Sequence, residues 1–137
     1  MVVCAAPSYL TRRGRPTTPA DLRQHDCLVF SETLEPIEWH FQSPKGRISV
    51  KVRGRLCANN LDAMVSVAIG GAGIARVPSW QASADLSAGR LEALLTQYER
   101  PAAPVHVVFQ QSKGSSAKAR AFIDYLHAQW PSEVFAA

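Results

Sequence analysis

Two stretches in which apolar and polar residues alternate predict a β-hairpin near the middle of the chain. They cover residues 37–42 and 47–53, with apolar side chains at Ile37, Trp39, Phe41, Ile48, Val50 and Val52. A period of two is that of a strand with one buried face. The intervening Ser43-Pro44-Lys45-Gly46 places Pro and Gly where a tight turn needs them. We therefore expect one face of the hairpin to be buried and the other to face water.

Short apolar runs predict further strands, and the continuously apolar run Cys27–Phe30 is expected to be a buried strand. These runs are Val2–Ala5, Cys27–Phe30, Ile74–Val77 and Val105–Phe109, and residues 91–95 are expected to be partly extended. A continuously apolar strand is typical of a sheet with layers on both sides.

A helical period appears in three further segments. Residues 61–69 are apolar at spacings of three and four behind Asn60, a good N-cap, and residues 80–86 predict a second helix. A last helix begins at Ser115 or Ser116 and ends before Pro131, with a stripe of Ala119, Phe122, Ile123, Leu126 and Trp130. Shorter helical starts are expected at Tyr9-Leu10 and at Thr18-Pro19-Ala20-Asp21, which has the pattern of a capping box.

The order of these elements predicts an α/β domain with a mixed sheet. The chain has 137 residues, of which 47% are hydrophobic and 19% charged, which suits one globular domain and argues against disorder. The glycines at 70–73 follow a helix and lack the Lys-Ser/Thr of a phosphate-binding loop, so we expect them to end that helix.

The composition bears on the compartment in which the protein works and on the partners it can have. The three cysteines, Cys4, Cys27 and Cys57, form neither a CxxC pair nor a metal-ligand spacing, which favours a reducing cytoplasm and no metal site. The first residues lack the positive charge of an export signal, and no apolar run is long enough to span a membrane. The net charge is +4, but the basic residues are scattered along the chain and no helix-turn-helix pattern occurs, so we do not expect this chain alone to bind DNA.

Several strings, each weak alone, occur in one order and together are similar to the effector-binding domain of LysR-type transcriptional regulators. They include Cys4-Ala5-Ala6-Pro7-Ser8-Tyr9-Leu10, Pro19-Ala20-Asp21-Leu22, His25-Asp26-Cys27-Leu28, Gly70-Gly71-Ala72-Gly73-Ile74-Ala75, Ala88-Gly89-Arg90-Leu91 and Lys118-Ala119-Arg120-Ala121-Phe122-Ile123.

The resemblance implies a lobe like a type II periplasmic binding protein, in which two subdomains enclose a ligand cleft. Residues 1–5 would be a crossover strand, residues 6–104 the second subdomain, and residues 105–137 a crossover strand and the final helix of an incomplete first subdomain. It implies a sensor of a small organic ligand, with no cofactor and no catalytic residue. DNA would be bound only through a helix-turn-helix domain that this chain lacks.

The same resemblance assigns candidate effector-binding residues. The N-terminus of the helix after Asn60 can hold an anion or can be a plain cap. Phe30 can be a cleft wall or a core residue, and the residue after it can bind a ligand or form a turn. The full candidate set is Ala5, Ala6, Phe30, Ser31, Glu32, Asn59, Asn60 and Leu61.

A surface for self-association and two rival functions complete the expectations. The stripe of the last helix would lose its partners in an incomplete subdomain, so we expect a second copy to cover Phe122, Ile123, Leu126 and Trp130. A small enzyme on the same fold would need a nucleophile beside a base, such as Cys4 with His106. An exported solute-binding protein is the other rival, which the odd number of cysteines opposes.

Overall fold

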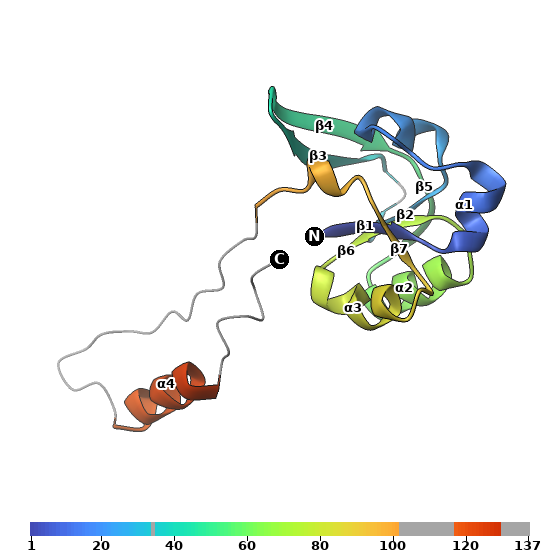
Figure 1. Ribbon diagram of the computed structural model, residues 1–137. Coiled ribbons are helices and arrows are strands. Elements are labelled where there is room, and N and C mark those ends of the chain that lie inside the picture. Colours follow the sequence, from blue (N-terminus) through green and yellow to red (C-terminus); the bar gives the residue numbers. More distant parts are fainter. Residues whose placement is uncertain (34, 102–116, 130–137) are drawn as a thin grey trace. The chain divides into compact units, whose positions relative to one another are not determined.

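A five-stranded mixed sheet is the centre of the first of two units, Met1–Arg100 and Pro101–Ala137 (Figure 1). The computed structural model describes residues 1–33, 35–101 and 117–129. The strands of this sheet lie in the order β5-β2-β6-β1-β7, and their bounds are β1 Val2–Ala5, β2 Cys27–Phe30, β5 Gly54–Ala58, β6 Ile74–Val77 and β7 Glu92–Leu94. The predicted α/β class with a mixed sheet is confirmed.

The direction of the strands defines two ends of the sheet. Strand β2 pairs in parallel with β5 and with β6, whereas β1 pairs antiparallel with β6 and β7. We call the end at which β2, β5 and β6 finish the carboxyl edge, and the opposite end the amino edge. Because β1 is antiparallel to β6, it begins at the carboxyl edge, where Val2 lies opposite Val77.

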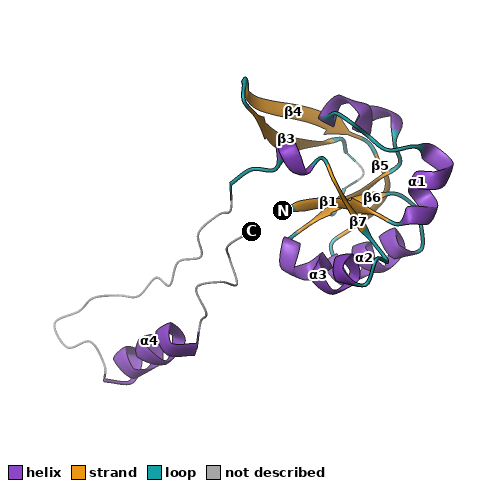
Figure 2. Ribbon diagram, viewed as in Figure 1, coloured by secondary structure: helices purple, strands orange, loops and turns teal. Residues whose placement is uncertain are grey.

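Both faces of the sheet are covered, as the continuously apolar run Cys27–Phe30 predicted for its own strand. Alternate residues of β1 point to opposite sides: Val2 and Cys4 pack with helices α2 (Leu61–Ile69) and α3 (Ser79–Ser87), whereas Val3 and Ala5 pack with α1 (Pro7–Arg13) and the hairpin. Figure 2 shows α2 and α3 on one side of the sheet and the hairpin on the other. We call these sides the helix face and the hairpin face.

The predicted hairpin consists of β3 (Ile37–Ser43) and β4 (Gly46–Val52), in a register that runs from Ile37 opposite Val52 to Ser43 opposite Gly46. Trp39, Phe41, Val50 and Val52 are buried, so the alternating pattern identified the inner face correctly. Gly46 has a φ of 122°, a conformation that side chains disfavour. The hairpin forms a sheet of its own rather than extending the main one.

One strand was missed. The alternation predicted one strand over residues 47–53, but β4 ends at Val52 and a further strand, β5, begins at Gly54 in the other sheet. The change of sheet requires a close backbone approach at Gly54, where an added Cβ would lie 3.0 Å from side-chain atoms of Val29 and Cys57. Local alternation cannot reveal this, because it continues across the break.

The predicted helix starts are present with their caps. The Asn60 side chain accepts a hydrogen bond from Ala63 N–H at 2.9 Å, and α2 ends at Ile69 as expected. The capping box at Thr18 begins η1 (Pro19–Gln24), which is a 3₁₀ helix. Backbone N–H groups of Thr17 and Thr18 donate to the Asp21 carboxylate, and these bonds lower the pKa of Asp21 to about 2.

The second unit contributes one described element, α4 (Ala117–Gln129), where the last helix was predicted. Phe122 and Tyr125 are about 60% exposed, whereas Ile123 and Leu126 are half-buried. The predicted crossover strand Val105–Phe109, the caps Ser115 and Ser116, and Trp130 lie outside the described residues.

Candidate functional site

The carboxyl edge brings together most of the candidate residues. Phe30 ends β2, Asn59 follows β5 directly, and the backbone N–H of Ser31 donates to the carbonyl of Ala58 at 3.1 Å, which fixes the two strand ends side by side. In open α/β sheets, ligands bind outside the carboxyl ends of the strands. This edge is therefore the candidate site.

Large apolar side chains are exposed at this edge. Phe30 is 51% exposed at the end of β2, Trp80 is 63% exposed in the first turn of α3, and Met1 is 56% exposed just before β1. Sequence reasoning singled out Phe30 and missed Trp80, which it had placed only as the start of a helix. The available signal was an aromatic residue two positions after Pro78, which follows the strand Ile74–Val77.

The N-termini of two helices also lie at this edge. Helix α2 follows β5 through Asn59 and Asn60, and α3 follows β6 through Pro78, which has no side chain that can cap. The Gln81 side-chain amide donates to the Asp62 carboxylate and so joins the first turns of the two helices. Helix N-termini present free N–H groups and a positive dipole end, which favour an anion.

The polar candidate residues at the carboxyl edge differ in whether their side chains already form hydrogen bonds within the protein. The Ser31 hydroxyl accepts from Thr33 N–H at 3.0 Å, an arrangement typical of a turn. The Asn60 oxygen is used in its cap, whereas Glu32 and Asn59 are exposed. Leu61 is half-buried and packs against the core on the helix face.

Arg76 is a second residue that sequence reasoning missed. It is the penultimate residue of β6 and is half-buried on the hairpin face, where its guanidinium donates to the His40 carbonyl at 2.8 Å and lies 5.4 Å from the centre of the Phe41 ring. No described carboxylate forms an ion pair with it. Burial, and secondarily the nearby Arg100, lower its pKa.

Ala5 and Ala6 do not lie with the other candidates. Ala5 ends β1 at the amino edge, about 10 Å along the strand from Val2. Ala5 is fully buried among core residues of the hairpin face, and Ala6, 2% exposed, packs on the helix face. Both alanines are therefore separated from Phe30 and Asn60, because β1 runs antiparallel to β6 and reaches Ala5 at the far end. Their role in effector binding stays a prediction.

The buried cysteines lie in an environment that disfavours the thiolate, which is the nucleophilic form of cysteine. Burial raises the pKa of Cys4 and of Cys27 to about 12, with small additional contributions from Asp85 and Asp26 respectively. An activated thiol needs a lowered pKa. The residue proposed as the base for Cys4, His106, lies outside the described residues. Among the residues that the structure describes, no group of three His, Cys, Asp or Glu side chains could hold a metal ion.

The model of one protein family, the LysR substrate binding domain, matches residues 1–131, nearly the whole chain. The chain belongs to this family. The LysR domain is 36% identical over 128 residues to the transcriptional activator AaeR of Escherichia coli, a match that covers 92% of this chain and 41% of that protein. It is 29% identical over 134 residues to the regulator PtxR of Pseudomonas aeruginosa, covering 98% of this chain and 43% of PtxR.

Solved structures agree with the family assignment. The regulatory domain of CrgA from Neisseria meningitidis superimposes with a TM-score of 0.72 at 25% identity, over 95% of this chain and 64% of that one. The regulatory domain of AphB from Vibrio vulnificus gives 0.69 at 26% identity, over 93% and 63%. The predicted fold, that of a type II periplasmic binding protein, is thereby confirmed. The LysR domain spans about two fifths of the length of its curated relatives.

The length and hydropathy of the helices bear on whether they can span a membrane. None of the helices in the described ranges has both the length and the hydropathy of a membrane span.

Proposed function

We propose that this LysR domain senses a small organic effector at its carboxyl edge and thereby regulates transcription, without chemical change of the ligand. The family match over residues 1–131 is the observation on which the proposal rests. Residues 6–104 would be the second subdomain, and residues 1–5 and 105–137 would link it to the first. DNA would be bound by a helix-turn-helix domain of the whole regulator, in the cytoplasm.

The geometry of the edge favours a ligand with an apolar body and a negative group. Phe30 and Trp80 offer exposed aromatic surface, and the first turns of α2 and α3 offer N–H groups beside Asn59 and Asn60. Pockets for small molecules combine such apolar walls with a few polar groups that orient the ligand. A carboxylate on an aromatic or aliphatic body fits both features.

The mechanism would be a difference in affinity between two arrangements of the subdomains. A ligand that binds both arrangements equally shifts no equilibrium. The carboxyl edge would therefore act as one wall of the cleft, and closure of the other wall would link ligand binding to the arrangement of the regulator on DNA.

Chemical-shift mapping of backbone amides tests the site directly, because it detects the weak binding expected of one wall. The probes are benzoate and butyrate, with benzyl alcohol as the uncharged control. Benzoate should shift the amides of Ser31, Asn60, Leu61 and Trp80, and benzyl alcohol should shift them less. Shifts confined to the amino edge or the hairpin would contradict the proposed site.

Self-association through α4 is a separate part of the proposal. Fully burying an aromatic or aliphatic side chain contributes about 1.5–3 kcal/mol, so a stripe formed by Phe122, Ile123, Leu126 and Trp130 favours a partner surface. Sedimentation should show a dimer or larger species that the double variant Phe122→Ser and Leu126→Ser reduces. A monomer at high concentration in the unaltered chain would refute this part.

A further inference from the structure

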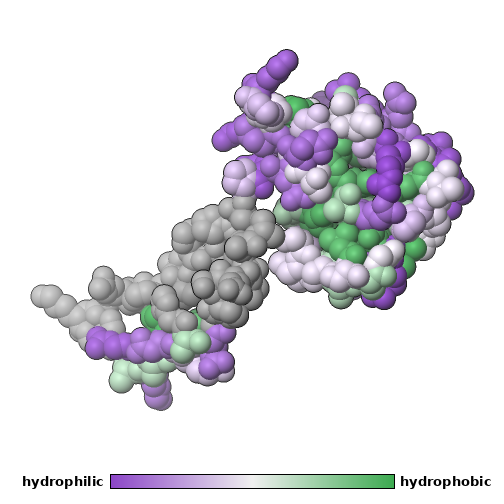
Figure 3. Space-filling view, in the orientation of Figure 1, coloured by the Kyte–Doolittle hydropathy of each residue, from purple (hydrophilic) through white to green (hydrophobic). Residues whose placement is uncertain are grey.

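The outer face of the hairpin is a basic surface that the effector site does not use. Trp39, Phe41, Val50 and Val52 point inward, so the alternate residues of both strands point to solvent. This outer face consists of Glu38, His40, Gln42, Arg47, Ser49 and Lys51, flanked by Lys45 in the turn and Arg53 after β4. Figure 3 shows hydrophilic residues over the hairpin end of the first unit.

Most of the chain's excess charge lies in this hairpin. Residues 37–53 contain four Lys or Arg residues and one Glu, a net charge of +3, against +4 for the whole chain. The other 120 residues contain 11 basic and 10 acidic side chains and are nearly neutral. Basic residues occur along the whole sequence, but the net charge is concentrated in this hairpin.

The hairpin cations are also unneutralised. The four ion pairs among the described residues involve Arg13, Arg15, Arg55 and Arg90, and none of them includes a hairpin residue. Glu38 lies directly opposite Lys51 in the register but forms no ion pair with it within 4.0 Å. Arg47, Lys51 and Arg53 are all exposed. Their charges are available to an external anion.

The side-chain types on the outer face of the hairpin favour one class of partner over the others. Protein interfaces are organised around buried aromatic and aliphatic anchors, and the outer face of the hairpin has none. Contacts to nucleic-acid phosphates come from Arg, Lys, Ser and Gln side chains, the types that dominate here. The outer face of the hairpin has no Phe, Tyr or Trp side chain on which an unpaired base could stack, which favours double-stranded over single-stranded nucleic acid.

We propose that the outer face of the β3–β4 hairpin binds the phosphate backbone of double-stranded DNA without reading its sequence. In a regulator held on DNA by another domain, this contact would bring the sensing domain against the duplex. It goes beyond the expectation that DNA is bound only through a helix-turn-helix domain, and it does not depend on the effector site.

Fluorescence anisotropy with a labelled 30-base-pair duplex tests this at about 50 mM salt, where phosphate contacts are strong. The double variant Arg47→Ser and Lys51→Ser is compared with Arg15→Ser and Arg90→Ser, which removes the same charge from ion-paired positions elsewhere. The hairpin variant should lose roughly tenfold in affinity, and the slope of log K against log salt should fall by about 1.8. The control should stay within about twofold of the unaltered chain.

Three results would overturn the proposal. Equal losses of affinity in both variants would show that only the net charge of the chain matters. A failure of the unaltered chain to bind the duplex would show that the hairpin surface does not bind DNA. Displacement of the duplex by polyglutamate at a lower charge concentration than by unlabelled duplex would assign the surface to an acidic protein instead. Circular dichroism of both variants verifies that they are folded.

Discussion

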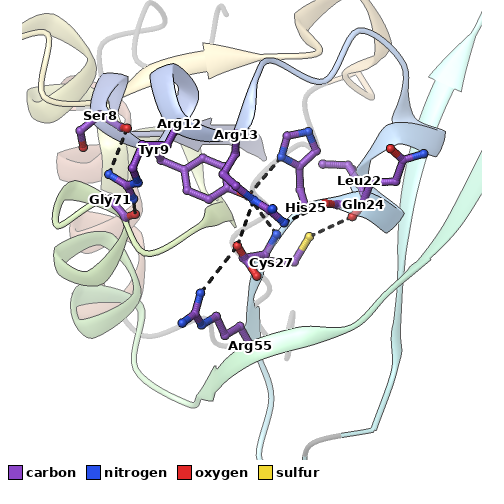
Figure 4. A network of polar contacts seen from close by, with 11 residues as sticks. Ser8, Tyr9, Arg12, Arg13, Leu22, Gln24, His25, Cys27, Arg55 and Gly71 are labelled. Carbon is purple, nitrogen blue, oxygen red and sulfur yellow. Dashed lines mark hydrogen bonds and ion pairs between the residues drawn. The ribbon is translucent and has the colours of Figure 1, made fainter.

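The two ends of the main sheet are built in opposite ways. At the amino edge, polar groups bond to one another (Figure 4). The Tyr9 hydroxyl contacts His25 Nδ1 at 3.1 Å and accepts a hydrogen bond from Asp26 N–H at 2.9 Å. Arg13 and Arg55 form ion pairs with the Asp26 carboxylate. At the carboxyl edge, aromatic side chains are exposed and helix N-termini face outward.

This difference indicates what each end does. Groups at the amino edge satisfy one another and hold α1, η1, β2 and β6 together, as when Arg12 donates to the Gly71 carbonyl at 2.6 Å. Groups at the carboxyl edge leave apolar surface and helix N-termini without a comparable network of protein partners. Substitutions at the amino edge should therefore mainly lower stability, and those at the carboxyl edge should mainly affect binding.

The largest expected effect is that of Gly73→Ala at the amino edge. An added Cβ would lie 2.4 Å from the Asp26 carbonyl oxygen, the same atom that accepts from Ile74 N–H at 2.8 Å. Overpacking against backbone should lower the free energy of unfolding by about 1–3 kcal/mol or more, measured by urea denaturation. Gly70→Ala is the matched control, because its nearest contact would be 3.4 Å. Equal stabilities of the two variants would contradict the packing described here.

A smaller effect should appear as pH dependence from His25. Since Tyr9 accepts from Asp26, its own proton is available to His25 Nδ1, which requires a neutral imidazole. Burial, and next Arg13, lower the pKa of His25 below 6.5. The neutral form therefore stabilises the fold above pH 6.5, and this contribution is lost as the pH falls through the lowered pKa.

His25→Gln is the control for that prediction, because the amide oxygen can accept from Tyr9 without titrating in this range. The loss of unfolding free energy between pH 7.5 and pH 5 should be larger in the unaltered chain than in the variant. Identical pH profiles would exclude His25 as the source.

The smallest effect on stability is expected at the carboxyl edge. Phe30→Ala and Trp80→Ala remove side chains that are more than half exposed, so each should change the free energy of unfolding by less than about 1 kcal/mol. The same variants should weaken the chemical shifts induced by benzoate at Ser31 and Asn60. A large loss of stability with unchanged benzoate shifts would reverse the assignment of the two ends.

Much of this fold was determined by local sequence. The apolar runs at Val2–Ala5, Cys27–Phe30 and Ile74–Val77 gave strands with the predicted bounds, and Asn60 and Thr18 gave helix starts with the predicted caps. Alternation, continuous apolar runs and cap residues act over a few positions, so they can be interpreted without knowing the rest of the chain.

Tertiary structure alone decided which residues meet. The antiparallel direction of β1 separated Ala5 from Phe30, and the change of sheet at Gly54 created β5. Packing left Trp80 exposed beside the candidate site, and it left Arg76 half-buried without an ion pair to a described carboxylate. Strand direction and pairing depend on contacts between residues far apart in sequence, and local patterns do not encode them.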